Sequence, residues 1–105
     1  MTFSKIQKDV DTWAKQFAKP YWEPLAILAR VTEETGELAR EINHSHGEKP
    51  KKASESKGDI GEEMADIIFA LCCLANRLDV DLDQEWKKVM KKCYGRDNDR
   101  FERSA

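Results

Sequence analysis

A short acidic pattern occurs twice in this chain and constrains its fold more than any other feature. Two adjacent acids followed by a third acid three places on occur at 33–37 and again at 62–66. On an α-helix, residues three positions apart share a face. The repeat therefore predicts two helices that face each other through paired carboxylates. The carboxylates that share a face are those of Glu34 with Glu37 and of Glu63 with Asp66.

Four carboxylates between two helices need a cation, because burying unpaired charges is costly. Oxygen ligands with no Cys or His in register suit Mg²⁺, with Mn²⁺ as a second possibility, rather than zinc. A di-iron bundle would require Glu-x-x-His on two helices, whereas the third positions here are Glu37 and Asp66. On the first helix alone, a solvated acidic surface explains the acids equally well. The second helix favours the metal site.

Composition limits the class of protein. The 105 residues correspond to one domain, 1–105, and only five Gly and three Pro favour a mostly helical chain. A net charge of −2 gives no overall polyanion-binding surface, so nucleic acid is not an expected partner. No apolar segment is long enough to span a membrane, and the first residues lack the apolar core of a signal peptide. Three cysteines without a C-x-x-C motif predict reduced, buried thiols and a cytoplasmic protein.

Helix-start signals occur at four places along the chain. Ser4, Asp59 and Asp81 begin capping patterns, Pro24 fits a first helical turn, and Gly95 is a stop signal. With the spacing of the apolar residues, these signals predict helices over about 4–18, 24–46, 59–78 and 81–94. The stretch 47–58 is predicted to be a loop; its lysines are either solvated or close to an anionic ligand.

An apolar run from 64 to 75 contains Asp66 as its only polar side chain. A helix that is apolar all round is expected to be buried all round, and three other helices of so short a chain cover it poorly. We therefore expect a four-helix bundle-like all-α domain that self-associates as a homodimer or homotetramer. Within this run, Asp66 is either paired with a cationic side chain or bound to a metal, and the repeat favours the metal.

Aromatic and basic residues outside the acidic repeat are candidates for contact with a ligand. Trp13 lies on an apolar stripe and is expected in the core, whereas Trp22, in a connector flanked by prolines, is a candidate to stack on a base. Lys92 and Arg96 offer cations for a phosphate, although neighbouring acids nearly balance the basic tail.

The doubled acidic motif resembles the signature of the MazG-like all-α nucleoside triphosphate pyrophosphohydrolases. The flanking residues agree, with Pro24-Leu25-Ala26 before the first half, Gly36 through Glu41 across it, and the apolar run after Asp66. The resemblance covers nearly the whole chain and is strongest with the short, single-domain bacterial members. Thr35 stands where many relatives have an apolar residue.

The resemblance implies an enzyme that hydrolyses a ribo- or deoxyribonucleoside triphosphate to the monophosphate and pyrophosphate with Mg²⁺, in nucleotide-pool house-cleaning. It implies that Glu33 and Glu62, the leading acids of each half, help to place a second ion or the attacking water. Our hypothesis is that a metal-activated water attacks phosphorus, with Glu33 or Glu62 as its orienter or base. It does not identify the preferred base. The implied metal ligands are Glu34, Glu37, Glu63 and Asp66, and the implied phosphate contacts are Lys92 and Arg96.

Two other functions fit the same residues. One is a nucleotide- or metal-binding module without turnover, although such a module has no evident need for Glu33 and Glu62. The other is a structural helical protein that pairs through the apolar run. Metal dependence discriminates between them, because a bound ion stabilises the folded state by mass action.

Overall fold

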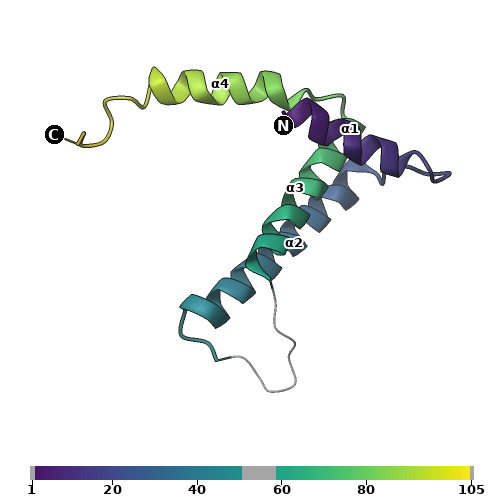
Figure 1. Cartoon of the computed structure of the whole chain (residues 1–105), viewed down its shortest axis with the longest axis horizontal. Helices are drawn as coiled ribbons and strands as arrows, with labels where there is room; N and C mark the ends of the chain where they lie inside the picture. The colour runs from purple at the N-terminus through teal and green to yellow at the C-terminus, as the bar shows by residue number, and fades with distance from the viewer. Residues whose placement is uncertain (1, 51–58, 105) are drawn as a thin grey trace.

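The computed structural model describes residues 2–50 and 59–104, and within these ranges the fold is all-α (Figure 1). The prediction of an all-α chain with four main helices is confirmed. The predicted loop 47–58 lies mostly outside the described residues, which end at Pro50 and resume at Asp59. The four helices are α1 (Phe3–Ala14), α2 (Pro24–His46), α3 (Ile60–Arg77) and α4 (Leu82–Tyr94).

The last three helices begin and end where local sequence signals predict. Pro24 occupies the first turn of α2, where a missing amide donor costs nothing. The Asp59 carboxylate caps α3 by accepting a hydrogen bond from the Glu62 amide at 3.1 Å. Asp81 caps α4 in the same way, and Gly95 follows its last residue. Short polar side chains at these positions satisfy amides that the helix leaves unpaired.

The predicted cap of the first helix was wrong. Thr2 is the N-cap of α1 and accepts from the Lys5 amide at 3.1 Å. Ser4 instead donates its hydroxyl hydrogen to the Asp83 carboxylate at 2.6 Å. Asp83 also accepts from the amides of Phe3 and Ser4, at 2.9 and 3.2 Å. The start of α1 is therefore capped both by Thr2 and by a side chain from the first turn of α4.

The first helix is also shorter than predicted. It ends at Ala14, and the amides of Gln16 and Phe17 bond three residues back, to Trp13 and Ala14. This tight turn keeps the Phe17 ring against Trp13, with 5.0 Å between ring centroids. The apolar spacing thus continues beyond the helix, which explains why it predicts a longer one.

Helices α2 and α3 lie side by side and run antiparallel, with α1 across their upper end (Figure 1). The buried core where these helices meet consists of small and medium side chains, and Cys72 is the largest that is fully buried. Trp13 was expected in this core but is half exposed. The buried apolar residues are Val10, Ala14, Ile27, Ala70, Cys72 and Ala75.

A hydrogen-bond network joins α1 to α3 and to the start of α4. The Gln7 side-chain amide donates to Asn76 Oδ1 and to the Val80 carbonyl, at 3.0 and 2.8 Å, and accepts from the Leu82 amide at 3.0 Å. Asn76 in turn donates to the Gln7 carbonyl and to the Tyr21 hydroxyl, both at 3.0 Å. Hydrogen bonds between polar side chains thus fix the junction of α1, α3 and α4, where the apolar core is small.

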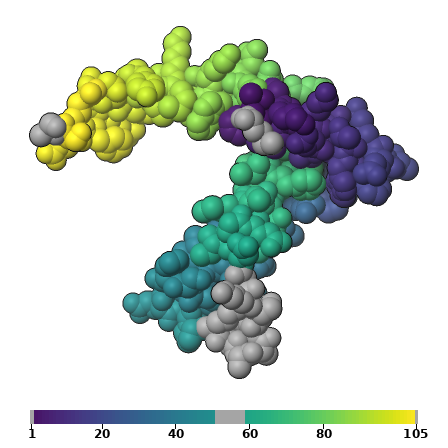
Figure 2. Space-filling view, viewed as in Figure 1, coloured from purple at the N-terminus to yellow at the C-terminus, as the bar shows by residue number. Residues whose placement is uncertain are grey.

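Helix α4 projects from this junction and packs mainly on α1, leaving a hollow between itself and the α2–α3 pair (Figure 2). The four helices do not close into a bundle within one chain. The radius of gyration is 17.4 Å, against about 13 Å for a compact domain of 100 residues. Large apolar side chains remain exposed on α3 and α4, among them Ile68, Leu71, Trp86 and Val89.

Two further sequence expectations are tested by the described residues. No helix within 2–50 and 59–104 is long and apolar enough to cross a bilayer. All three cysteines are free thiols, but only Cys72 is buried, while Cys93 on α4 is exposed. The expectation of buried thiols was therefore wrong for Cys93, and Cys73 is only partly buried. Within the described residues, α1 packs on α4 but leaves Cys93 exposed.

Candidate metal centre and adjoining cavity

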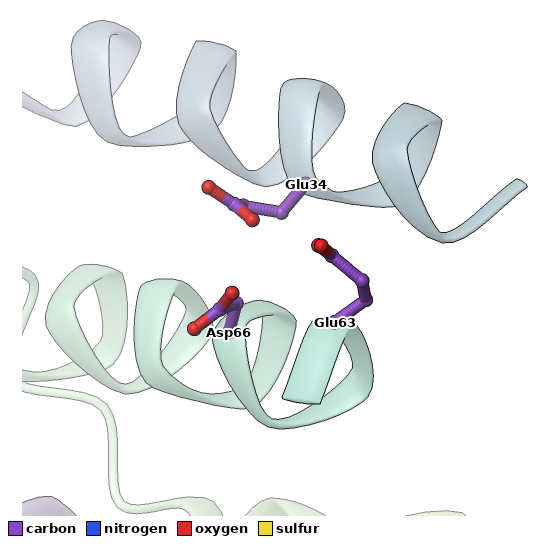
Figure 3. Close-up of side chains that lie close together, drawn as sticks. All are labelled: Glu34, Glu63 and Asp66. Carbon is purple, nitrogen blue, oxygen red and sulfur yellow. The ribbon is translucent and has the colours of Figure 1, made fainter. Parts of the chain in front are cut away.

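Three carboxylates from the acidic repeat meet between α2 and α3. One oxygen each of Glu34, Glu63 and Asp66 lies within 4.8 Å of the others. Glu34 extends from α2 toward the other two side chains on α3 (Figure 3). All three are partly buried. The predicted convergence of the two halves of the repeat is therefore present in the fold.

The electrostatics of this cluster are unfavourable without a cation. The pKa of Glu63 is raised, first by desolvation and then by the negative charges of Asp66, Glu34, Glu37 and Glu41. Among the described residues, the cation paired with the cluster is Arg30, whose Nε lies 4.0 Å from Glu34 Oε1. At that distance and exposure an ion pair contributes little.

The donor set fits a hard divalent cation. All three groups are carboxylates, and neither His nor Cys belongs to the cluster. Oxygen donors are the ligands that Mg²⁺ and Mn²⁺ prefer, whereas zinc sites generally contain nitrogen or sulfur ligands. A divalent ion between these oxygens would also offset the repulsion that raises the Glu63 pKa.

The remaining predicted acids lie beside the cluster. Glu37 is exposed, one turn beyond Glu34, and does not belong to the group of three. Its charge nevertheless contributes to the raised pKa of Glu63. Glu33 and Glu62 are exposed and precede Glu34 and Glu63 in the chain. Their roles, and the role of Glu37 as a fourth ligand, stay predictions.

The predicted phosphate-binding cations are not brought to the acids by their own chain. Lys92 is in the last turn of α4, and Arg96 follows that helix. Helix α4 runs away from the α2–α3 pair (Figure 1). The Arg96 guanidinium makes two hydrogen bonds to the Asp97 carboxylate, at 3.0 and 3.1 Å, which raise the pKa of Arg96.

An aromatic cavity adjoins the acidic cluster. It encloses about 290 Å³ and is bordered by Trp13, Trp22 and Phe69 together with Arg30. Trp22 is half exposed, and the Arg30 guanidinium carbon lies 5.7 Å from its ring centroid. The predicted base-stacking residue is therefore connected to the carboxylates through Arg30.

The sequence prediction missed Arg30. This residue precedes Glu34 by four positions, which places both on one face of α2. Phe69 and Ala70 follow Asp66 by three and four positions on α3, so they line the cavity opposite Arg30. The helical spacing contained this information, but nothing in the sequence alone set one arginine apart from the others.

The comparisons with known proteins agree with this geometry. Residues 23–101 match the MazG nucleotide pyrophosphohydrolase domain. YpjD of Bacillus subtilis is 51% identical over 102 residues, covering 97% of this chain and 92% of YpjD. YvdC of the same organism is 34% identical over 94 residues, covering 80% of this chain and 89% of YvdC.

Two crystal structures share the fold. That of YpjD from Bacillus subtilis gives a TM-score of 0.78 at 51% identity, covering 88% of this chain and 94% of that one. The Bacillus-conserved MazG protein, a nucleotide pyrophosphohydrolase, gives 0.76 at 43% identity and covers 88% of both chains. With the matched domain extending over both halves of the acidic repeat, this chain belongs to the MazG nucleotide pyrophosphohydrolase domain family.

Proposed function

We propose that this protein hydrolyses nucleoside triphosphates to monophosphates and pyrophosphate with Mg²⁺, with Mn²⁺ as a possible substitute. The observation that carries the proposal is the convergence of Glu34, Glu63 and Asp66 within 4.8 Å. A triphosphate is strongly anionic, so this cluster would repel it without a cation between them. Bound Mg²⁺ would supply that bridge, polarise phosphorus and make a coordinated water more acidic.

Within this proposal, the acids of the repeat have two roles. Glu34, Glu37, Glu63 and Asp66 hold the metal, and Glu33 or Glu62 orients or deprotonates the attacking water. Hydrolysis in ¹⁸O-labelled water tests which phosphorus is attacked. Label in the monophosphate is expected, whereas label in pyrophosphate alone would exclude attack at the α-phosphorus.

The reaction itself is tested with a panel of ribo- and deoxyribonucleoside triphosphates in Mg²⁺, measuring pyrophosphate and orthophosphate separately. Pyrophosphate release by the native protein that vanishes in Glu63→Ala would support the proposal and identify the substrate. No release from any triphosphate, by a folded protein that binds metal, would favour a binding module without turnover. The panel also tests a house-cleaning role, which predicts a preference for modified or non-standard nucleotides.

We also propose that the protein acts as a homodimer or homotetramer in which Lys92 and Arg96 serve the site of another copy. The open shape and the exposed apolar side chains of α3 and α4 support self-association. The direction of α4 supports supply between subunits, because it leads both cations away from the acids of their own chain (Figure 1).

Mixed oligomers test this arrangement. Glu63→Ala and Arg96→Ala are each expected to be inactive or nearly so. Co-expressed copies should regain part of the activity, since one kind of mixed site would have both its acids and its arginine intact. No recovery in oligomers shown to be mixed would contradict supply from another copy.

We further propose that Trp22 stacks on the base, which its half exposure at the cavity permits. Trp22→Ala should raise the Michaelis constant and change the selectivity among bases. An unchanged Michaelis constant and selectivity would show that Trp22 has no such role. Phe17→Ala is the comparison variant, because this aromatic also borders the cavity but packs its ring against Trp13.

A further inference from the structure

Arg30 has a defined position between the aromatic cavity and the acidic cluster. Its guanidinium carbon lies 5.7 Å from the Trp22 ring centroid and 5.5 Å from that of Phe69, within the range of cation–π attraction. Its Nε lies 4.0 Å from Glu34 Oε1. Contacts on several sides restrict the guanidinium, although the side chain keeps 37% of its surface exposed. It therefore retains donors that can contact a ligand.

The cavity beside Arg30 has the size and lining of a site for a flat ring. Its volume of about 290 Å³ is at the lower end of the range for small-molecule sites, roughly 300–1,000 Å³. Aromatic and aliphatic side chains make up most of its border. A base fits such a space, while the sugar and phosphates would extend toward the carboxylates.

Few polar side chains border this cavity among the described residues. They are Lys19, Tyr21 and Arg30, with the thiol of Cys73. The Tyr21 hydroxyl already donates to Asp11 and accepts from Asn76. Lys19 is an exposed side chain in the connector before α2. The indole N–H groups of Trp13 and Trp22 also border the cavity, but each is a single donor. Arg30 is thus the described group on this border that presents several donors in a fixed planar fork.

We propose that Arg30 determines base specificity by donating two hydrogen bonds to a base edge with two neighbouring acceptors. Guanine offers N7 and O6, and cytosine offers N3 and O2. Adenine and uracil place a donor beside each such acceptor, which would face an arginine that has only donors. The inference rests on the proposed function, since it assumes that a nucleotide is the substrate.

Nucleoside binding tests the inference without metal or turnover. Guanosine, cytidine, adenosine and uridine are titrated in EDTA against the fluorescence of Trp13 and Trp22, which border the cavity. The native protein is expected to favour guanosine or cytidine by on the order of ten- to a hundred-fold, the discrimination typical of a bidentate pair. Equal affinity for all four nucleosides would overturn the proposal before any variant is made.

Variants then test whether Arg30 is the cause. Arg30→Lys keeps the charge but loses the planar fork, and Arg30→Gln loses both the charge and the fork. Each should abolish the preference while the fold remains, as checked by circular dichroism. Arg77→Lys is the matched control, because Arg77 is equally exposed at 38% and pairs with Glu23 outside the cavity. A preference that survives in folded Arg30→Lys would refute the role of the fork.

The hydrolysis panel separates this inference from the proposed function. If native protein releases pyrophosphate but the ratio of kcat/KM between guanine and adenine substrates is the same in Arg30→Lys, the function stands and the inference fails. If no triphosphate is hydrolysed but native protein shows the preference and Arg30→Lys loses it, the proposed reaction fails and the role of Arg30 in base recognition stands.

Discussion

The α2–α3 pair and helix α4 differ in what their own chain provides for them. The pair contains four of the six buried apolar residues and brings together three carboxylates from distant parts of the sequence. Helix α4 has no buried residue in the described structure, and Trp86 and Val89 on it are 51% and 41% exposed. Both helical regions are amphipathic, but among the described residues only the pair has part of its apolar surface buried, and Ile68 and Leu71 on α3 stay exposed.

This difference indicates which groups each region would contribute to the proposed site. The acids that would hold a metal are positioned by packing within one chain. The cations that would contact phosphate lie at the end of α4, which leads away from those acids in its own chain (Figure 1). Under the proposed self-association, one chain would contribute its acids to one site and its cations to another.

The largest expected effect is on the α2–α3 pair, from removal of a carboxylate that is proposed to bind metal. Asp66→Asn keeps the shape of the side chain but removes its charge, and we expect pyrophosphate release to fall by more than about a hundred-fold. Glu37→Gln should also reduce activity if Glu37 is the fourth ligand, by a smaller factor because it lies outside the cluster. Steady-state rates with a Mg²⁺ titration measure both. Asp9→Asn, which removes a surface ion pair with Lys5 on α1, should leave the rates unchanged.

The next largest expected effect concerns helix α4 rather than the α2–α3 pair. Val89→Asp places a charge on the exposed apolar side of α4, and burying it at a subunit contact would cost several kcal/mol. We expect the dissociation constant of the oligomer to rise by on the order of a hundred-fold or more, measured by sedimentation. Lys88→Gln, at the adjacent polar position, is the control. Unchanged sedimentation of Val89→Asp would show that this face of α4 is not the contact.

Truncation to alanine of one buried and one exposed side chain sharpens the comparison further. Ile27→Ala removes a side chain that is only 3% exposed and should lower the free energy of unfolding by about 2–4 kcal/mol. Val89→Ala should change it by less than about 0.5 kcal/mol in dilute, monomeric protein. Urea unfolding at low protein concentration measures both. A similar loss for the two variants would mean that α4 is covered within its own chain.

The smallest expected effect is on the Tm. The difference in Tm between native protein and a Glu63 variant should change sign when Mg²⁺ is added. A carboxylate whose folded pKa is raised favours folding below its unfolded value of 4.5, and this contribution is lost as the pH rises through the folded pKa. Without metal at pH 7, Glu63→Gln should therefore have a Tm a few degrees higher than native protein. With Mg²⁺ the native Tm should rise and that of the variant should not. A native Tm that does not change when Mg²⁺ is added would argue against a metal site at the acidic cluster.

The Asp83 cap between α4 and α1 should show the opposite dependence of stability on pH from that of Glu63. Hydrogen bonds from the Ser4 hydroxyl lower the pKa of Asp83 below its ordinary 3.8. Its stabilisation is present above that value and is lost as the pH falls through the lowered pKa. Asp83→Asn should thus reduce the Tm at pH 7, and the difference from native protein should shrink in acid.

The parts of the fold that were predicted correctly depend on local chemistry. Pro24, Asp59, Asp81 and Gly95 act on amides and carbonyls within a few residues of themselves, so the sequence alone locates three helices. Thr2 caps α1 locally, but the amides of Phe3 and Ser4 depend on Asp83, 80 positions away from Phe3. No spacing rule relates residues so far apart, and Ser4 and Gln7 happened to form a local pattern while bonding elsewhere.

The candidate site also has some features that the sequence could predict and others that it could not. The convergence of Glu34, Glu63 and Asp66 follows from a repeat with helical spacing, which periodicity can detect. The role proposed for Arg30 depends on two aromatic rings from different parts of the chain. The direction of α4 depends on the junction at Gln7, which no local signal specifies. Contacts within an element were therefore predictable, and contacts between elements were mostly not.

The bond between Phe3 and Asp83 has a consequence for the order of folding. It joins residues 80 positions apart in a chain of 105 residues, and the entropic cost of closing a loop grows with its length. The antiparallel α2–α3 hairpin needs only a short connection and can form earlier. We expect the base of α4 to be fixed last, so the surface proposed for self-association would acquire its final direction only in a chain whose acidic cluster is already formed. Chains would then associate after folding rather than during it.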